Sequence, residues 1–164
     1  LVPVETPEIE GPMADAGLLY TTEAWATWGH EIAARGAVMF PPIRERFAAG
    51  AQHSGADYEA AWQRLHAARA QWAARMAGFD AALAPTAPNL PPQADRLMSD
   101  GDYYVTENLL TLRNTRIGNL MGLCGLTLPV AGHPSCGLMA LAPAMAEARL
   151  LRLGIGLEAA LAAA

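Results

Sequence analysis

The pattern of apolar and polar positions changes most sharply between residues 113 and 141, RNTRIGNLMGLCGLTLPVAGHPSCGLMAL. Two apolar runs stand there, at residues 126–130 and 137–141, separated by a turn through Gly132 and Pro134. Short apolar runs bounded by Gly and Pro are typical of buried strands, because a helix needs a longer uninterrupted stretch. The connection of about six residues is too short for a parallel crossover, so the two strands should pair as an antiparallel hairpin.

Apolar residues at steps of three and four predict amphipathic helices over much of the remaining chain. Further short apolar runs at residues 1–5 and 80–84 predict strands. Helices that alternate with strands indicate an α/β fold, in which helices cover a mixed β-sheet. The expected helices span residues 13–35 (as one helix or two), 43–49, 56–79, a stretch from an N-cap at Thr106 to the break at Gly122, and 147–161.

The segment Pro85-Thr86-Ala-Pro88 follows one of these predicted strands. A proline on each side of Thr86 holds the backbone extended and should prevent ladder pairing, so we expect the segment to line a surface or a cleft. Residues 89–101, which are rich in Pro, Asp and Ser, then predict a long loop without periodicity. Loops of this length in compact domains are often lids or disordered.

Composition excludes several classes of function. The net charge is -5, every positive charge is an arginine, and the sequence contains neither a basic cluster nor a lysine, so neither nucleic acid nor a membrane is expected as a partner. No apolar run reaches the roughly 18 residues of a membrane span. The four histidines are scattered without metal-ligand spacing. Cys124 and Cys136 lie among apolar residues. The sequence leaves a disulfide between them open, but buried free thiols are the commoner state and favour a cytoplasmic location.

Two blocks in the right order, over roughly residues 79–160, resemble the amidase signature family. The segment from Asp80 to Pro88, DAALAPTAP, is similar to that family's D-x-L-x-x-P-T-x-P segment. The second block resembles the C-terminal part of the family and consists of Asn119, Gly122, Gly125, Pro129, Gly137-Leu138, and a closing helix with Leu150-Leu151 and Glu158.

This resemblance implies hydrolysis of a C–N amide bond through an acyl-serine intermediate, with a lysine and a bridging serine as the proton relay and backbone N–H groups as the oxyanion hole. No metal or organic cofactor is implied. The catalytic lysine and serines of the family lie in its N-terminal half, which nothing in this sequence matches. Residues 1–164 are therefore expected to be a single C-terminal segment of a larger amidase domain whose N-terminal catalytic half is absent.

The expected partners are a small-molecule amide substrate, the missing N-terminal half of the same protein, and a second copy in a possible homo-oligomer. The alternative hypothesis is a non-catalytic assembly or binding module that retained the packing segments of the family. Four polar residues within or near residues 113–141 are the candidates for substrate binding: Arg113, Asn114, Asn119 and Tyr104. Arginine can pair with a carboxylate, and asparagine offers an amide both a donor and an acceptor. Equally, Asn119 could bond the local backbone and Arg113 could be a surface charge.

Overall fold

The computed structural model describes residues 1–133 and 135–163, so Pro134 of the expected turn lies outside the described residues. The chain divides into two compact units, Leu1–Trp72 and Ala73–Ala164, and each is considered by itself. The prediction that the whole chain is one segment of a larger domain stays a prediction.

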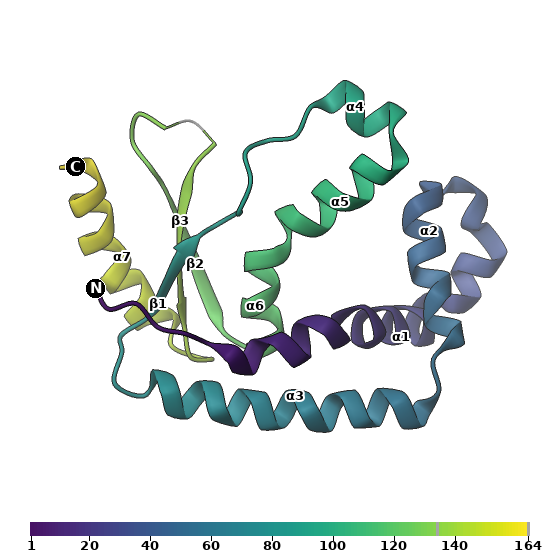
Figure 1. Ribbon diagram of the computed structural model, residues 1–164, viewed down its shortest axis with the longest axis horizontal. Helices are drawn as coiled ribbons and strands as arrows, with labels where there is room; N and C mark the ends of the chain where they lie inside the picture. The colour runs from purple at the N-terminus through teal and green to yellow at the C-terminus, as the bar shows by residue number, and fades with distance from the viewer. Residues whose placement is uncertain (134, 164) are drawn as a thin grey trace. The chain divides into compact units, whose positions relative to one another are not determined.

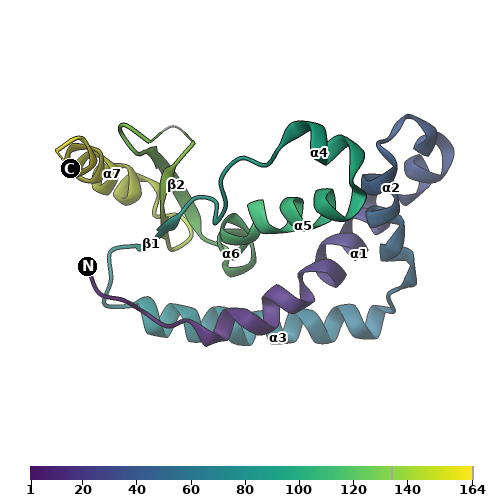
Figure 2. The ribbon, with the colours of Figure 1, turned by 45° about the horizontal axis from the view of Figure 1, so that its top comes forward.

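Three helices make up most of the first unit (Figures 1 and 2): α1 (Glu10–Arg35), α2 (Pro41–Ala48) and α3 (Gly55–Met76), the last of which crosses the unit boundary. Residues 13–35 therefore belong to one helix rather than two. Short 3-10 turns cover Pro7–Ile9, Gly36–Val38 and Ala49–Gln52. The buried apolar residues are Ala16, Leu19 and Ile32 of α1 and Ala61, Leu65, Ala68 and Trp72 of α3.

The strand expected at residues 1–5 is wrong. This segment has no regular structure, and Leu1 and Val2 are exposed. Pro3 lacks the N–H that a ladder requires at its position. Among the residues that the structure describes, no strand pairs with the segment. Because no described strand pairs with this segment, its alternating apolar residues have no sheet in which to be buried.

The second unit is built on a small sheet with the strand order β1-β3-β2. The helices α4 to α6 connect β1 to β2, the hairpin follows, and the last helix closes the unit. The elements are β1 (Ala82–Pro85), α4 (Ala94–Ser99), α5 (Gly101–Thr111), α6 (Arg113–Met121), β2 (Cys124–Pro129), β3 (Gly137–Ala142) and α7 (Glu147–Ala162).

The α/β fold class and the antiparallel hairpin are confirmed, but the sheet is not mixed in its pairing. β3 pairs antiparallel with both β1 and β2. β1 and β2 consequently run in the same direction, as strands joined by a helical crossover do. They are not neighbours, because β3 returns between them, and so the described strands contain no parallel pair.

Side chains of β3 are buried on both faces of the sheet. Ala140 and Ala142 form a core with Leu150 of α7, and Leu141 approaches Gly118 of α6 on the other face. Figure 1 shows α7 and α6 on opposite sides of the strands. A strand covered on both faces carries a continuous apolar run rather than an alternating one, which is why the run at residues 137–141 was recognisable in the sequence.

The region between β1 and β2 departs most from the sequence prediction. The loop expected at residues 89–101 contains α4, and α5 begins at Gly101, so Thr106 is not an N-cap. The N-cap is Asp100, whose side chain accepts the N–H of Tyr103. The helical stretch is then interrupted at Leu112 and ends, as expected, at Gly122, which has the left-handed φ of 67°. A polar contact caps the start of α5, and hydrophobic periodicity does not report such a contact.

Among the residues that the structure describes, no helix combines the length and the apolarity that crossing a lipid bilayer requires.

Candidate functional site

The carboxyl ends of β1 and β2 lie at the same edge of the sheet. Pro85, the last residue of β1, is opposite Leu138, and Pro129, the last residue of β2, is opposite Gly137. Both pairs stand at the start of β3. In α/β proteins, ligands bind preferentially beyond the carboxyl ends of strands that share a direction. We call the residues at this edge the strand-end site: Pro85, Thr86, Asn114, Thr127 and Gly137.

Thr86 links the three strands at this edge. Its backbone N–H donates to the carbonyl oxygen of Gly137 at 2.8 Å, and its Oγ1 lies 3.3 Å from Oγ1 of Thr127. β1 ends at Pro85, as expected, but the prolines do not prevent pairing with β3. Pro85 is paired with Leu138, and Thr86, which keeps its own N–H, adds one further hydrogen bond. Gly137 is required here, since a Cβ at that position would lie 2.7 Å from Oγ1 of Thr86.

Asn114 fixes the point at which the chain leaves the sheet. Its Nδ2 donates to the carbonyl oxygen of Pro85 at 2.7 Å. Asn114 thus reaches the strand-end site from the first turn of α6, which the turn at Leu112 separates from α5. Together with the hydroxyls of Thr86 and Thr127, its amide gives this edge both hydrogen-bond donors and acceptors, the combination that an amide substrate needs.

The other three candidate residues lie elsewhere in the second unit. Arg113 is the first residue of α6 and is exposed. Asn119 is also exposed, and its carbonyl oxygen accepts the N–H of Gly122 at 3.3 Å, within the cap that ends α6. Tyr104 is half-buried in the first turns of α5. Of the four, Asn114 alone is a member of the strand-end site.

Sequence reasoning missed a cluster that ties the segment after β1 to α5. Nδ2 of Asn89 donates to Oε2 of Glu107 at 2.7 Å and to Oγ1 of Thr111 at 3.0 Å. Oδ1 of Asn89 is buried without a hydrogen-bond partner. The spacing of Glu107 and Thr111, four residues apart, places both on one face of a helix and was the available signal. Asn89, which lies in the predicted loop, has no sequence pattern that identifies it as their partner.

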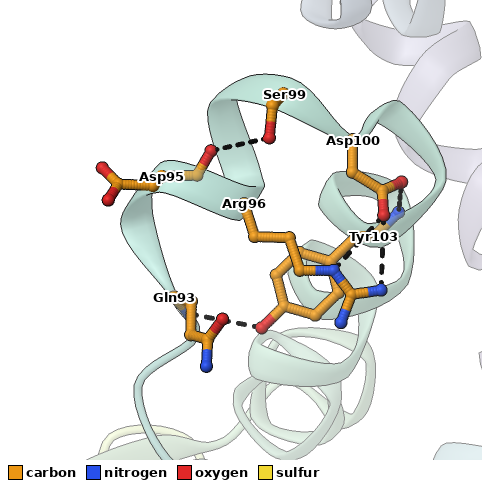
Figure 3. A network of polar contacts seen from close by, with 6 residues as sticks. All are labelled: Gln93, Asp95, Arg96, Ser99, Asp100 and Tyr103. Atoms are coloured by element: carbon orange, nitrogen blue, oxygen red, sulfur yellow. Dashed lines mark hydrogen bonds and ion pairs between the residues drawn. The ribbon is translucent and has the colours of Figure 1, made fainter.

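A second network fastens α4 to the start of α5 (Figure 3). The guanidinium carbon of Arg96 lies 4.1 Å from the ring centroid of Tyr103, and its Nη2 lies 3.3 Å from Oδ2 of Asp100. Oδ1 of Asp100 accepts the N–H of Tyr103 at 2.9 Å, while the hydroxyl of Tyr103 accepts the N–H of Gln93 at 3.2 Å. The N–H of Tyr103 is the main cause that holds the pKa of Asp100 below its ordinary value. Desolvation opposes it, and Arg96 lowers the pKa further.

The two cysteines differ in environment. Cys124 is half-buried, and its Sγ lies 3.2 Å from the carbonyl oxygen of Pro143. Cys136 is exposed immediately before β3, so the expectation that both thiols are buried is wrong for this residue. Both are free. Within the described residues, no three His, Cys, Asp or Glu side chains come together as a metal-binding group.

Comparison with known proteins finds similarity in sequence and in fold. The chain is 37% identical over 127 residues to a 2-amino-5-chloromuconic acid deaminase of Comamonas testosteroni, a match that covers 73% of this chain and 26% of the relative. It also matches a crystal structure of an amidase with a TM-score of 0.74 and 24% identity, over 95% of this chain and 36% of that chain. This chain therefore spans about a quarter to a third of the proteins that it matches. No protein-family model matches it.

Proposed function

Because this chain belongs to the amidase signature family, we propose that it forms the C-terminal part of a hydrolase that cleaves a carbon–nitrogen amide bond. The observation that carries the proposal is the 37% identity to the deaminase, since the similarity to the amidase structure concerns the fold. In this proposal the protein acts in the cytoplasm on a small-molecule amide. Its two free cysteines suit a reducing compartment.

The proposed chemistry is an acyl-enzyme mechanism with two serines and a lysine. These 164 residues contain no lysine, so the relay would come from a part of the protein other than this chain. The role of this chain is then to complete the sheet and to form one side of the substrate pocket. The strand order supports that role, because β1 and β2 each have an edge that is not paired with another described strand. Unpaired edges of this kind favour continuation of a sheet.

We assign the substrate contacts of this chain to Asn114, Arg113, Asn119 and Tyr104. Asn114 is the best supported, because its amide already reaches the strand-end site. Its Oδ1 can accept an N–H of a substrate amide while Nδ2 holds Pro85. Arg113 is exposed and suits a carboxylate group. The name of the deaminase relative specifies an acid as its substrate, which agrees with a guanidinium in this role.

The test is to read the coding sequence that precedes Leu1 and to assay its longest product against a panel of amides and amino-substituted unsaturated acids. The proposal expects a lysine and a glycine- and serine-rich loop in the preceding sequence, and hydrolysis by the whole product. The chain of 164 residues assayed alone should show no turnover above the buffer rate. Turnover by this chain alone, or inactivity of a product that contains the lysine and loop, would contradict the proposed chemistry.

Substitution then separates the roles of the residues in this chain. Asn114→Ala should lower kcat/KM by about 10- to 100-fold, because a polar contact to the substrate and the support of Pro85 are lost together. Arg152→Ala, at an exposed position of α7, is the matched control and should leave activity unchanged.

The alternative proposal is a non-catalytic assembly or binding module, and the absence of lysine from the chain is the observation that favours it. Such a module would bind its partner chain without contributing to turnover. A preceding sequence that lacks both the lysine and the serine-rich loop would support this alternative. A second copy of the chain is a further possible partner, which sedimentation of the purified chain would reveal.

A further inference from the structure

The segment from Asn89 to Thr111 differs from the rest of the second unit in having no residue in the hydrophobic core. Neither α4 nor α5 contains a buried residue. Several of the large apolar side chains in and beside the segment are exposed: Leu90 at 71%, Met98 at 84%, Val105 at 45%, Leu109 at 44% and Leu112 at 44%. Segments with little buried apolar surface have low free energies of local opening. We call residues 89–111 the arm.

The two halves of the arm are fastened to one another at several places. Asn89 is tied to Glu107 and Thr111 near the base, and the N–H of Gln93 is bonded to the hydroxyl of Tyr103 further along. At the tip, the contacts of Arg96 with Asp100 and Tyr103 join α4 to α5 (Figure 3). Ties at the base, the middle and the tip oppose sliding between the two halves. The arm is therefore built to move as one body.

The arm joins the sheet through two short connections. One is the pair of residues 87–88, which follows the last contact with the sheet, the hydrogen bond from the N–H of Thr86 to the carbonyl oxygen of Gly137. The other is Leu112, which lies between α5 and α6 with φ of -85° and ψ of -4°. Hinges are commonly a few residues at the ends of regular elements, where a change in φ and ψ displaces the whole element beyond them. Both connections therefore have the placement of hinges.

From these observations we propose that the arm is a lid that swings as a unit about residues 87–88 and Leu112, and so controls access to the strand-end site. The ties to Tyr103 are the latch that keeps its two halves together. The exposed Leu90 is close in sequence to the first hinge, so closure would bring apolar surface over the site and exclude water. The motion depends on the fold alone, whereas the covering of an amide substrate rests on the proposed function.

Distances between spin labels test the motion without substrate or activity. One pair, Met98→Cys with Ile155→Cys, joins the arm to α7, and a second pair, Met98→Cys with Leu109→Cys, lies within the arm. Both are made in the full chain with Cys124→Ala and Cys136→Ser. All three labelled positions are exposed, so labelling should not disturb packing. We expect the arm-to-α7 distribution to be at least about twofold broader than the distribution within the arm, since hinge motion displaces whole elements.

A narrow distribution of the label distance from the arm to α7 would contradict the lid motion. A broad distribution of the label distance within the arm would show that the arm does not move as one body. If the chains with two labels fail to fold, a single label at Met98→Cys with Cys136→Ser tests the same motion. It should broaden the amide resonances of α7 through a transiently populated state, and unchanged resonances would contradict the proposal. Because no readout uses turnover, failure of the lid and failure of the proposed function are distinguishable.

The latch is tested by Tyr103→Phe, which removes the hydroxyl that Gln93 contacts but keeps the ring beneath Arg96. Amide exchange of residues 93–99 should become about fivefold faster, as expected when one hydrogen bond of ordinary net strength is lost. Amides of β3 are the internal control and should not change. Equal exchange of α4 in both chains would show that Tyr103 does not latch the arm.

Discussion

The second unit holds its parts together in two different ways. Between β3 and α7, small residues allow close packing, and Ala140, Ala142 and Leu150 are almost fully buried. In the arm, by contrast, no residue of α4 or α5 is buried, and directed polar contacts link the two halves. A closely packed interface opens only when many contacts are lost together. Separate hydrogen bonds and ion pairs can each break without the others. The difference separates a fixed scaffold from a part that can move.

The largest effect that this comparison predicts is at the centre of the packed core. Leu150→Ala should lower the free energy of unfolding by about 2–4 kcal/mol, because the side chain is 3% exposed and its removal leaves a cavity. Denaturant unfolding followed by circular dichroism measures the change. Leu151→Ala on the same helix, where the side chain is 60% exposed, is the control and should change stability by less than about 0.5 kcal/mol. Equal losses at both positions would remove the distinction between core and surface.

Two glycines of α7 should respond with opposite signs. A Cβ at Gly154 would overlap Cδ2 of Leu126, whereas a Cβ at Gly156 meets nothing within 4 Å. Gly154→Ala should therefore destabilise the fold by about 1–2 kcal/mol, because the contact must be relieved by movement. Gly156→Ala should stabilise the fold by up to about 1 kcal/mol, since alanine is the better helix former. Thermal melting of the two variants measures the change in stability. A higher melting temperature for both would show that α7 does not approach β2 closely.

A smaller effect is expected where α7 holds the chain that enters β1. Nη2 of Arg149 donates to the carbonyl oxygens of Phe79 at 3.1 Å and Asp80 at 2.8 Å. Arg149→Met should cost about 0.5–1 kcal/mol, a modest loss because the guanidinium is half-exposed and its charge is screened. Arg152→Met, three residues further along α7, should be close to neutral. If the two variants are equally stable, the contact contributes nothing to the fold.

The smallest effect concerns the pH dependence of the arm. The N–H of Tyr103 and the guanidinium of Arg96 lower the pKa of Asp100 from its ordinary value of 3.8. Because the folded pKa is the lower one, the contribution of this carboxylate is complete above pH 3.8 and is lost as the pH falls through the folded pKa. The amide resonance of Tyr103 should follow that titration. In Arg96→Met the midpoint should rise, and an unchanged midpoint would show that Arg96 does not act on Asp100.

The same contrast explains what could be predicted from the sequence. The strands at residues 126–130 and 137–141 and the helix at 147–161 were predicted closely, because burial leaves an apolar pattern. α4 and the N-cap at Asp100 were missed, since their contacts join residues whose spacing carries no such pattern. In the strand-end site, Asn114 was predicted from its chemistry and its neighbourhood. The contribution of Gly137 depends on the approach of Thr86, 51 residues earlier in the sequence, and only the fold reveals it.

The position of β3 between β1 and β2 also orders the assembly of the sheet in time. Ala82 pairs with Leu141, which is synthesised 59 residues later, so β1 cannot pair until β3 has been made. Until then β1 and β2 have no strand between them, and the helices of the intervening segment can form first because their contacts are local. The sheet therefore closes only when its last strand has been synthesised. A chain truncated after Gly132 should therefore leave β1 and β2 without the strand that pairs with both of them.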